Sequence, residues 1–213
     1  MNTFIKIETD QGGIDLFSST GKSIDHHSAH LDQLMVWLTV IDKLELMPQG
    51  SGKALPFNDY RFVLQYNAML NISTLELAVL ARQLYISKHR WEKLYFSKQA
   101  YAIIYETIEK FNQYNKTMHS LLSQRSSITL NEFKTIASLI KEYKVKYDYE
   151  GTIREVRNRV ASHIEDFKLY YPIINSIDTD NSLGAILEFV LILNSLQGIT
   201  TGLSKAFQDE FTK

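Results

Sequence analysis

The sequence predicts an all-α protein, a helical bundle of about five to seven helices in which long helices run antiparallel. Two observations indicate this class. Only 3 prolines and 9 glycines occur among 213 residues, so long stretches lack helix-breaking residues. Apolar residues also recur every three or four positions over most of the chain, which is helical periodicity. With 45% hydrophobic and 22% charged residues, we assign residues 1–213 to a single domain.

The first elements differ in character. TFIKIE alternates weakly and TDQGG ends in a Gly-Gly pair, so residues 1–22 fit a short β-hairpin or an N-terminal extension. From Ile24 to Met47 the spacing is helical, and PQGSGKALP then predicts a loop. The stripe expected to face the core consists of Leu31, Leu34, Met35, Leu38 and Ile41.

The middle of the chain predicts two helices and then a long one. Asn58 is suited to cap a helix that begins near Asp59. Ser73 with Glu76 forms a capping box, which predicts a new helix after Asn71. Residues 88–122 contain neither proline nor glycine and carry apolar side chains at helical spacing, so we expect one long helix there.

Three further helices are expected. Thr129 with Glu132 forms a second capping box. The next helix should run from Asp148 to about residue 170, before Pro172. The last should run from about Ser182 to residue 211, and its first half is apolar on nearly every side, which predicts a central position in the bundle.

Composition excludes several classes of protein. The formal net charge of −1 does not fit a polycation that grips nucleic acid over its whole surface. The absence of cysteine excludes disulfides and thiolate chemistry. MNTFIKIETD lacks the apolar core of a signal peptide, and the apolar run Leu183–Leu193 is short of the roughly 20 residues that cross a bilayer. We expect a soluble, cytoplasmic protein without membrane contact.

The stretch VRNRVASH, residues 156–163, carries two arginines, an asparagine and a histidine within two helical turns. On a regular helix, Val156, Val160, His163, Ile164 and Phe167 share one stripe, so His163 would face inward. Periodicity alone favours a hydrogen-bonded core or interface histidine beside a solvated face of arginines. That face would pair Arg154, Arg157 and Arg159 with Glu155 and Glu165.

The same stretch resembles the signature of HEPN-domain proteins, in which an arginine, often followed by a polar residue, precedes a histidine by four to six residues. Here Arg157-Asn158 precedes His163 with five residues between arginine and histidine. KHRWEKLYFSKQAYAIIYE, residues 88–106, also resembles the long aromatic-rich helix of abortive-infection members. The resemblance extends over residues 88–211 in character, whereas residues 1–87 depart from the minimal domain.

This resemblance implies RNA cleavage without metal or cofactor, in which the ribose 2′-hydroxyl attacks the adjacent phosphate. His163 would then move protons, and Arg157 would stabilise the phosphorane oxygens. Asn158 would act as a positioning residue through hydrogen bonds. The family also implies a homodimer in which two motif helices build one composite cleft, so that Arg157 would work beside His163 of the second copy. Val156, Val160 and His163 form an apolar strip with a polar centre that could make this contact across a twofold axis. A role as a bacterial defence or toxin-type effector, with an antitoxin or sensor partner, would follow.

Two alternatives stay open at this point. A regular helix puts Arg157 about 120° from His163 but Arg159 only about 40° away, so either arginine is a candidate for the site. Residues 134–159 hold seven Lys/Arg against four Asp/Glu, and Arg154 and Arg159 are candidate contacts for phosphate or RNA. The second alternative concerns the function. Instead of a nuclease, the chain could be a catalytically inactive HEPN-like bundle that binds a partner protein or a nucleotide.

Two other features carry weaker signals. His26 and His30 in DHHSAH lie one helical turn apart, a metal-binding spacing, but only Asp25 or His119 could be suggested as a third ligand, so we expect no metal site. Tyrosines around the motif could stack on unpaired bases, although helix packing is the commoner role and the one we favour. They are Tyr143, Tyr147, Tyr149, Tyr170 and Tyr171.

Overall fold

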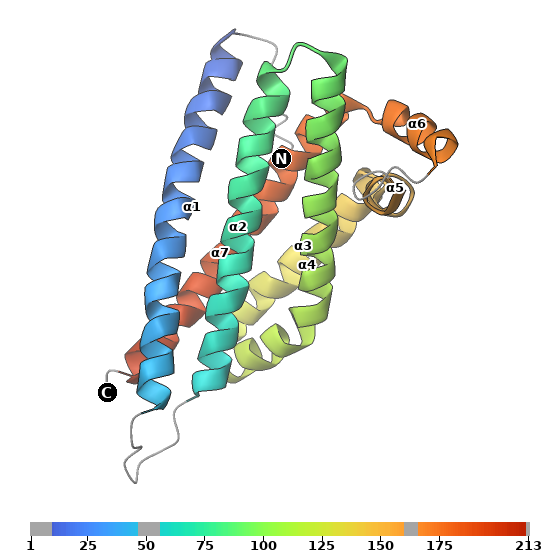
Figure 1. The fold of residues 1–213 in the computed structure, drawn as a ribbon. Coiled ribbons are helices and arrows are strands. Elements are labelled where there is room, and N and C mark those ends of the chain that lie inside the picture. Colours follow the sequence, from blue (N-terminus) through green and yellow to red (C-terminus); the bar gives the residue numbers. More distant parts are fainter. Residues whose placement is uncertain (1–9, 47–55, 160–165, 212–213) are drawn as a thin grey trace.

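The computed structural model describes residues 10–46, 56–159 and 166–211, and the all-α prediction is confirmed over these residues, which contain no strand. The chain forms a bundle of long helices with two short helices at its side (Figure 1). The elements are α1 (Asp10–Glu45), α2 (Phe57–Ile86), α3 (Arg90–Arg125), α4 (Ser127–Lys146), the π-helical turn η1 (Tyr149–Ile153), α5 (Arg154–Arg159), α6 (Phe167–Ser176) and α7 (Thr179–Phe211).

The long helices pack around α2 and α7. Helix α2 contacts α1, α3 and α7, while α7 contacts α2, α3 and α4, in agreement with the central position that its apolar sequence predicts. Helix α7 runs obliquely behind α2 and α3, and α5 and α6 lie beside α3, outside the main bundle (Figure 1). The two short helices therefore occupy an edge of the molecule.

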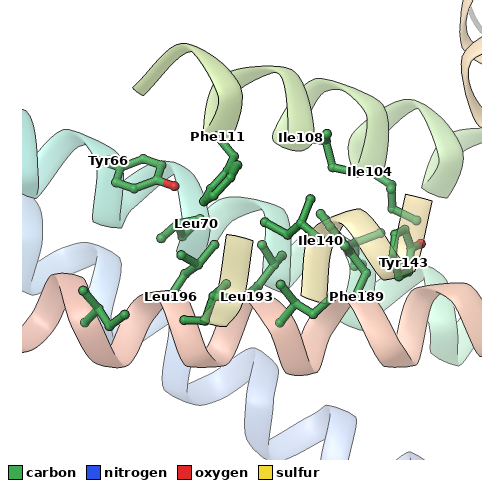
Figure 2. Packing of buried hydrophobic residues seen from close by; sticks show 14 of the residues in the cluster. Tyr66, Leu70, Ile104, Ile108, Phe111, Ile140, Tyr143, Phe189, Leu193 and Leu196 are labelled. Carbon is green, nitrogen blue, oxygen red and sulfur yellow. The ribbon is translucent and has the colours of Figure 1, made fainter. Parts of the chain in front are cut away.

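The core lies between α2, α3, α4 and α7. Side chains from α3 point toward those of α7, and Tyr143 of α4 lies among them (Figure 2). The Tyr143 hydroxyl donates to the Ala185 carbonyl at 3.1 Å, so this buried polar group is paired. Complete burial of each large apolar side chain contributes about 1.5–3 kcal/mol before the entropy cost. The central members are Ile104, Ile108, Phe111, Ile140, Phe189, Leu193 and Leu196.

Helix α1 begins earlier than predicted. Residues 10–22 are helical, and Gly12 and Gly13 lie inside the helix, so the hairpin predicted for residues 1–22 is wrong over its described part. Residues 1–9 lie outside the described residues. Leu34 and Ile41 are buried as predicted, but Met35 is exposed because, among the described helices, α1 packs only on α2. The predicted loop PQGSGKALP also lies almost wholly outside the described residues.

Helix α2 is continuous where two helices were predicted. Ser73 does not cap a helix; it is buried in the middle of α2, where its hydroxyl accepts from Thr107 Oγ1 at 2.9 Å. Asn71 uses its amide to bond the Asn67 carbonyl at 2.8 Å within the same helix. Asn71 Oδ1 also accepts from His27 of α1, so both side chains make contacts between helices, and their pattern resembles a helix start without being one. The N-cap of α2 is Pro56 rather than Asn58.

Helices α3, α4 and α7 follow the prediction more closely. The long helix predicted for residues 88–122 is confirmed as α3. Helix α4 starts at Ser127, because the Ser126 hydroxyl, rather than Thr129, caps it by accepting from the Thr129 backbone N–H at 3.3 Å. The predicted last helix is confirmed as α7 and begins three residues early, at Thr179.

The single helix predicted from Asp148 to about residue 170 is wrong. It is divided into η1, α5 and α6, and α6 has an N-cap of its own, Asp166, whose backbone is extended and whose carboxylate accepts from the Lys168 N–H at 2.8 Å. Phe167 therefore does not continue the stripe of Val156. Pro172 lies inside α6 instead of ending a helix. Val160, His163, Ile164 and Glu165 lie outside the described residues.

By length and composition, α7 is the one helix of residues 10–46, 56–159 and 166–211 that could cross a membrane. Half of its most apolar window is buried inside the protein, and the central helix of a bundle passes the same test. The buried half of this window packs against α2, α3 and α4.

Candidate functional site

The turn before α5 is held by one aspartate. Asp148 adopts a left-handed conformation with φ of 45°, which aspartate tolerates better than most residues. Its carboxylate accepts from the Gly151 N–H at 3.2 Å and from Thr152 Oγ1 at 2.9 Å. A Cβ at Gly151 would lie 2.5 Å from Asp148 Oδ2, so glycine is needed for this close approach. The turn fixes the direction in which α5 leaves α4.

Buried side chains fix the rotation of α5. Ile153 and Val156 are both almost completely buried against the bundle. Because Val156 is used inside its own chain, it cannot line the twofold contact expected from the sequence. The next side chain, Arg157, consequently faces α3 at the edge of the bundle.

Arg157 is held by three neighbours. Its Nε and Nη2 atoms donate to Glu106 Oε1 at 2.8 and 2.5 Å, and its Nη1 donates to Asn158 Oδ1 at 3.2 Å. The guanidinium carbon lies 5.2 Å from the centroid of the Tyr105 ring, within cation–π distance. The Arg157 side chain is still 41% exposed, so solvent and ligands can reach it. Arg157 and Asn158, predicted as site residues, are thus adjacent and hydrogen-bonded.

The aromatic support of Arg157 is itself anchored. Tyr105 stacks on Tyr149, with ring centroids 5.6 Å apart and an angle of 7° between the rings. The Tyr149 hydroxyl donates to Glu109 Oε1 at 2.9 Å, and Lys144 Nζ lies 4.2 Å from its ring centroid. Burial and the Glu109 carboxylate raise the pKa of Tyr149, so this phenol stays neutral. Tyr149 is therefore a structural residue, in line with the packing role that we favoured for the tyrosines.

The other two arginines of α5 pair within their own segment. Arg154 Nη1 lies 2.8 Å from Glu150 Oε2, and Arg159 Nε lies 3.7 Å from Glu155 Oε1. Both side chains are more than half exposed, and such i,i+4 pairs contribute only a few tenths of a kcal/mol. Arg157 alone among the three is oriented by another helix. His163 lies outside the described residues, so its distance from either arginine is not described.

The histidine cluster lies in the middle of α1 rather than at a helix start. His26 and His30 stack with centroids 6.3 Å apart, while His27 turns inward and donates through Nδ1 to Asn71 Oδ1 at 2.7 Å. Asn67 Nδ2 lies 3.3 Å from His30 Nε2. No group of three or more His, Cys, Asp or Glu side chains in the described part of the chain is arranged to hold a metal ion.

A pocket of about 320 Å³ opens next to His30, where α1 and α7 both pack on α2. Its walls mix amide, hydroxyl and charged groups with Trp37 and two leucines. The pocket is lined by helices that do not carry Arg157, so it is separate from the α5 site.

A scan against family models finds no match, and neither the curated proteins nor the solved structures contain a significant match to this chain. The candidate site therefore rests on the residues themselves. Sequence reasoning missed Glu106 and Tyr105 as site residues, because 51 positions separate Glu106 from Arg157. The only signal was that both lie at the end of the aromatic-rich stretch that resembles the HEPN family.

Proposed function

We propose that this chain is a HEPN-like, metal-independent endoribonuclease that works as a cytoplasmic homodimer in bacterial defence or as a toxin-type effector. The observation that carries the proposal is Arg157-Asn158: an arginine oriented by a second helix, bonded to the asparagine beside it and still open to solvent. An RNA phosphate is the substrate group that such an arginine suits.

The chemistry divides between Arg157 and His163. A guanidinium has five N–H donors, and three of those on Arg157 are engaged with Glu106 and Asn158, which leaves two for phosphorane oxygens. His163 would take the proton from the attacking 2′-hydroxyl or give one to the leaving 5′-oxygen. Arg154 and Arg159, whose ion pairs are exposed and weak, could turn toward neighbouring phosphates.

Glu106 has a defined part in this proposal. Its carboxylate holds Nε and Nη2 of Arg157, so the arginine does not have to be ordered when RNA binds. Glu106 would be a positioning residue rather than a catalytic one.

The same ion pair supports a second candidate function. A salt bridge between α5 and α3 is also what a purely structural arginine would form, and then α5 would be an interface for a partner protein or a nucleotide in an inactive bundle. Cleavage assays on single-residue variants separate the two functions.

We expect purified protein to cut mixed single-stranded RNA in EDTA and to leave 2′,3′-cyclic phosphate ends. His163→Ala should lower the cleavage rate about 10²- to 10⁴-fold, and Arg157→Ala about 10²- to 10³-fold, with unchanged circular dichroism. Arg159→Ala is the comparison, because it removes an equal charge from the same helix; as a secondary phosphate contact, Arg159 should lower the rate less than Arg157 when it is replaced.

Two results would reject the nuclease. One is the absence of cleavage with or without metal. The other is a His163→Ala variant that cuts as fast as wild type, which would leave the binding bundle as the better description. Equal losses of cleavage rate in Arg157→Ala and Arg159→Ala would instead mean that Arg157 matters no more for cleavage than Arg159.

A further inference from the structure

Four aromatic side chains lie exposed at the junction of α3 and α6. Their exposed fractions are 53% for Trp91, 51% for Tyr95, 64% for Phe167 and 44% for Tyr171. Large apolar rings are usually more buried than this, and a contiguous exposed group marks a binding surface. We call these four residues the aromatic platform.

The rings of the platform come from two helices that are fastened together. Trp91 and Tyr171 have ring centroids 6.5 Å apart, and Phe167 lies 5.1 Å from Tyr171. Arg90 Nη2 donates to the Asn175 carbonyl at 3.3 Å, which links the start of α3 to the end of α6. Trp91, Tyr171 and Phe167 are therefore held beside one another, and Tyr95 lies one helical turn from Trp91 on α3.

The platform leads to Arg157 along one face of α3. Trp91, Tyr95, Lys98 and Tyr105 follow each other at spacings of four, three and seven residues, so they lie on one stripe of the helix. Tyr105 is the ring beneath the Arg157 guanidinium. Trp91 and Tyr105 are 14 residues apart, which is about 21 Å along the helix axis. Helix α6 also packs directly on α5.

The charge on the α3 side of the platform is positive. Residues 88–98 contain four lysine or arginine side chains, Lys88, Arg90, Lys93 and Lys98, against a single acid, Glu92. Lys98 Nζ lies 5.4 Å from the centroid of the Tyr95 ring. Exposed rings interspersed with cations are the surface that binds unpaired nucleic acid, because every base can stack and every phosphate is negative. An apolar protein surface has no corresponding need for the cations.

We propose that the aromatic platform stacks unpaired bases of single-stranded RNA and leads the strand along α3 to Arg157. This inference rests on the proposed function, since it names the form of RNA that the α5 site would receive. A separation of about 21 Å suits a strand of several nucleotides, within the 4–16 nucleotides that single-strand sites commonly span. RNA duplexes, whose bases are already stacked, should not use the platform.

Binding is measured apart from cleavage. The ligand is a 2′-O-methyl oligopyrimidine of about 12 nucleotides, which lacks the attacking hydroxyl, in a buffer with EDTA. Trp37 and Trp91 are the two tryptophans of the chain, so Trp37→Phe leaves Trp91 as the only tryptophan reporter. We expect the oligonucleotide to quench Trp91 emission, and a duplex of equal length to quench it far less.

The variants then assign the effect to the rings. Trp91→Ala and Tyr171→Ala should each weaken binding about 5- to 100-fold by anisotropy, whereas Trp91→Phe, which keeps a ring, should bind within about fivefold of wild type. Leu46→Ala is the control, because Leu46 is 86% exposed and follows α1 at the opposite end of the bundle (Figure 1). Circular dichroism checks that each variant is folded.

Three results would overturn the platform: no binding of the oligonucleotide, binding that Trp91→Ala and Tyr171→Ala leave unchanged, or dissociation of a dimer by these variants in sedimentation. The last result would identify a second copy of this chain as the occupant. Cleavage that fails while ring-dependent binding persists would reject the nuclease and keep the platform. Cleavage that depends on Arg157 but not on the rings would support the nuclease and reject the platform.

Discussion

His27 is the histidine of the DHHSAH cluster that faces the interior, and only 5% of it is exposed. Burial is the largest cause that lowers the pKa of His27, assisted by the neighbouring His26 and His30. Its hydrogen bond to Asn71 acts in the opposite direction. The pKa of His30 is lowered as well, again mainly by burial. The native protein therefore favours both rings in the neutral form.

These pKa shifts predict a loss of stability in mild acid. An unfolded histidine titrates near 6.5, so below about pH 6.5 the unfolded chain binds more protons than the folded one. The stabilisation is complete above that pH and is lost as the pH falls toward the lower native pKa values. We expect the free energy of unfolding, measured with urea, to fall between pH 7.5 and pH 5.

The matched variants are His27→Gln and His119→Gln. His27→Gln should lower stability at pH 7.5, because it disturbs the bond to Asn71, but its stability should depend less on pH. His119→Gln changes an exposed ring on α3 and should keep the slope of the wild type. A wild-type slope in the His27 variant would show that the buried ring is not the source of the pH dependence.

At the scale of elements, the turn that directs α5 depends on Gly151, which has no side chain. Gly151→Ala would bring a methyl group against the Asp148 carboxylate, which caps the turn. We expect a loss of about 1–2 kcal/mol in the free energy of unfolding and slower cleavage, because the orientation of Arg157 follows from this turn. Urea denaturation and the RNA assay measure the two effects.

Gly202→Ala is the control for that substitution. Gly202 lies inside α7, and no atom lies within 4 Å of an added Cβ. Alanine should therefore stabilise the helix by up to about 1 kcal/mol. If Gly151→Ala were equally stabilising, the contact with Asp148 would not govern the turn.

The helices that could be predicted are those whose periodicity is long and uninterrupted. The stretches that became α3 and α7 satisfied this condition, and both were predicted to within a few residues. The pattern at Ser73 and Asn71 was misleading because short polar residues cap helices and also form hydrogen bonds between helices, and sequence does not distinguish these uses. The left-handed Asp148 and the cap at Asp166 were missed because each depends on the local backbone path.

The candidate site was predictable only in part. Arg157 and Asn158 were predicted from a short pattern of neighbouring residues, and the structure adds a hydrogen bond between their side chains. Glu106 and the ring of Tyr105 come from another helix, and no local pattern connects them with α5. The packing of α5 on α3, which aligns the two, depends on Ile153 and Val156 being buried. The pairing of Arg157 with Glu106 and Tyr105 can therefore be recognised only from the tertiary structure.

For the whole molecule, the position of α5 at the edge of the bundle bears on assembly. Helices α5 and α6 lie outside the main bundle, so a second copy could approach them without disturbing the core (Figure 1). Val156 is buried in its own chain, which leaves the exposed Arg154, Asn158 and Arg159 as the described α5 residues most able to meet a partner. The proposed homodimer would therefore meet through polar groups at this helix.

The decisive test of that assembly is complementation. If each site joins Arg157 of one copy to His163 of the other, Arg157→Ala and His163→Ala homodimers are both inactive, but their heterodimer has one intact site and one site with neither residue. Random exchange makes about half of the dimers mixed, so an equal mixture should recover about a quarter of the wild-type cleavage rate. The control mixture, His163→Ala with the double variant Arg157→Ala/His163→Ala, should recover nothing. If both single variants are folded and dimeric in sedimentation and exchange subunits, yet no ratio restores cleavage, then Arg157 and His163 act within one chain and the composite site is wrong.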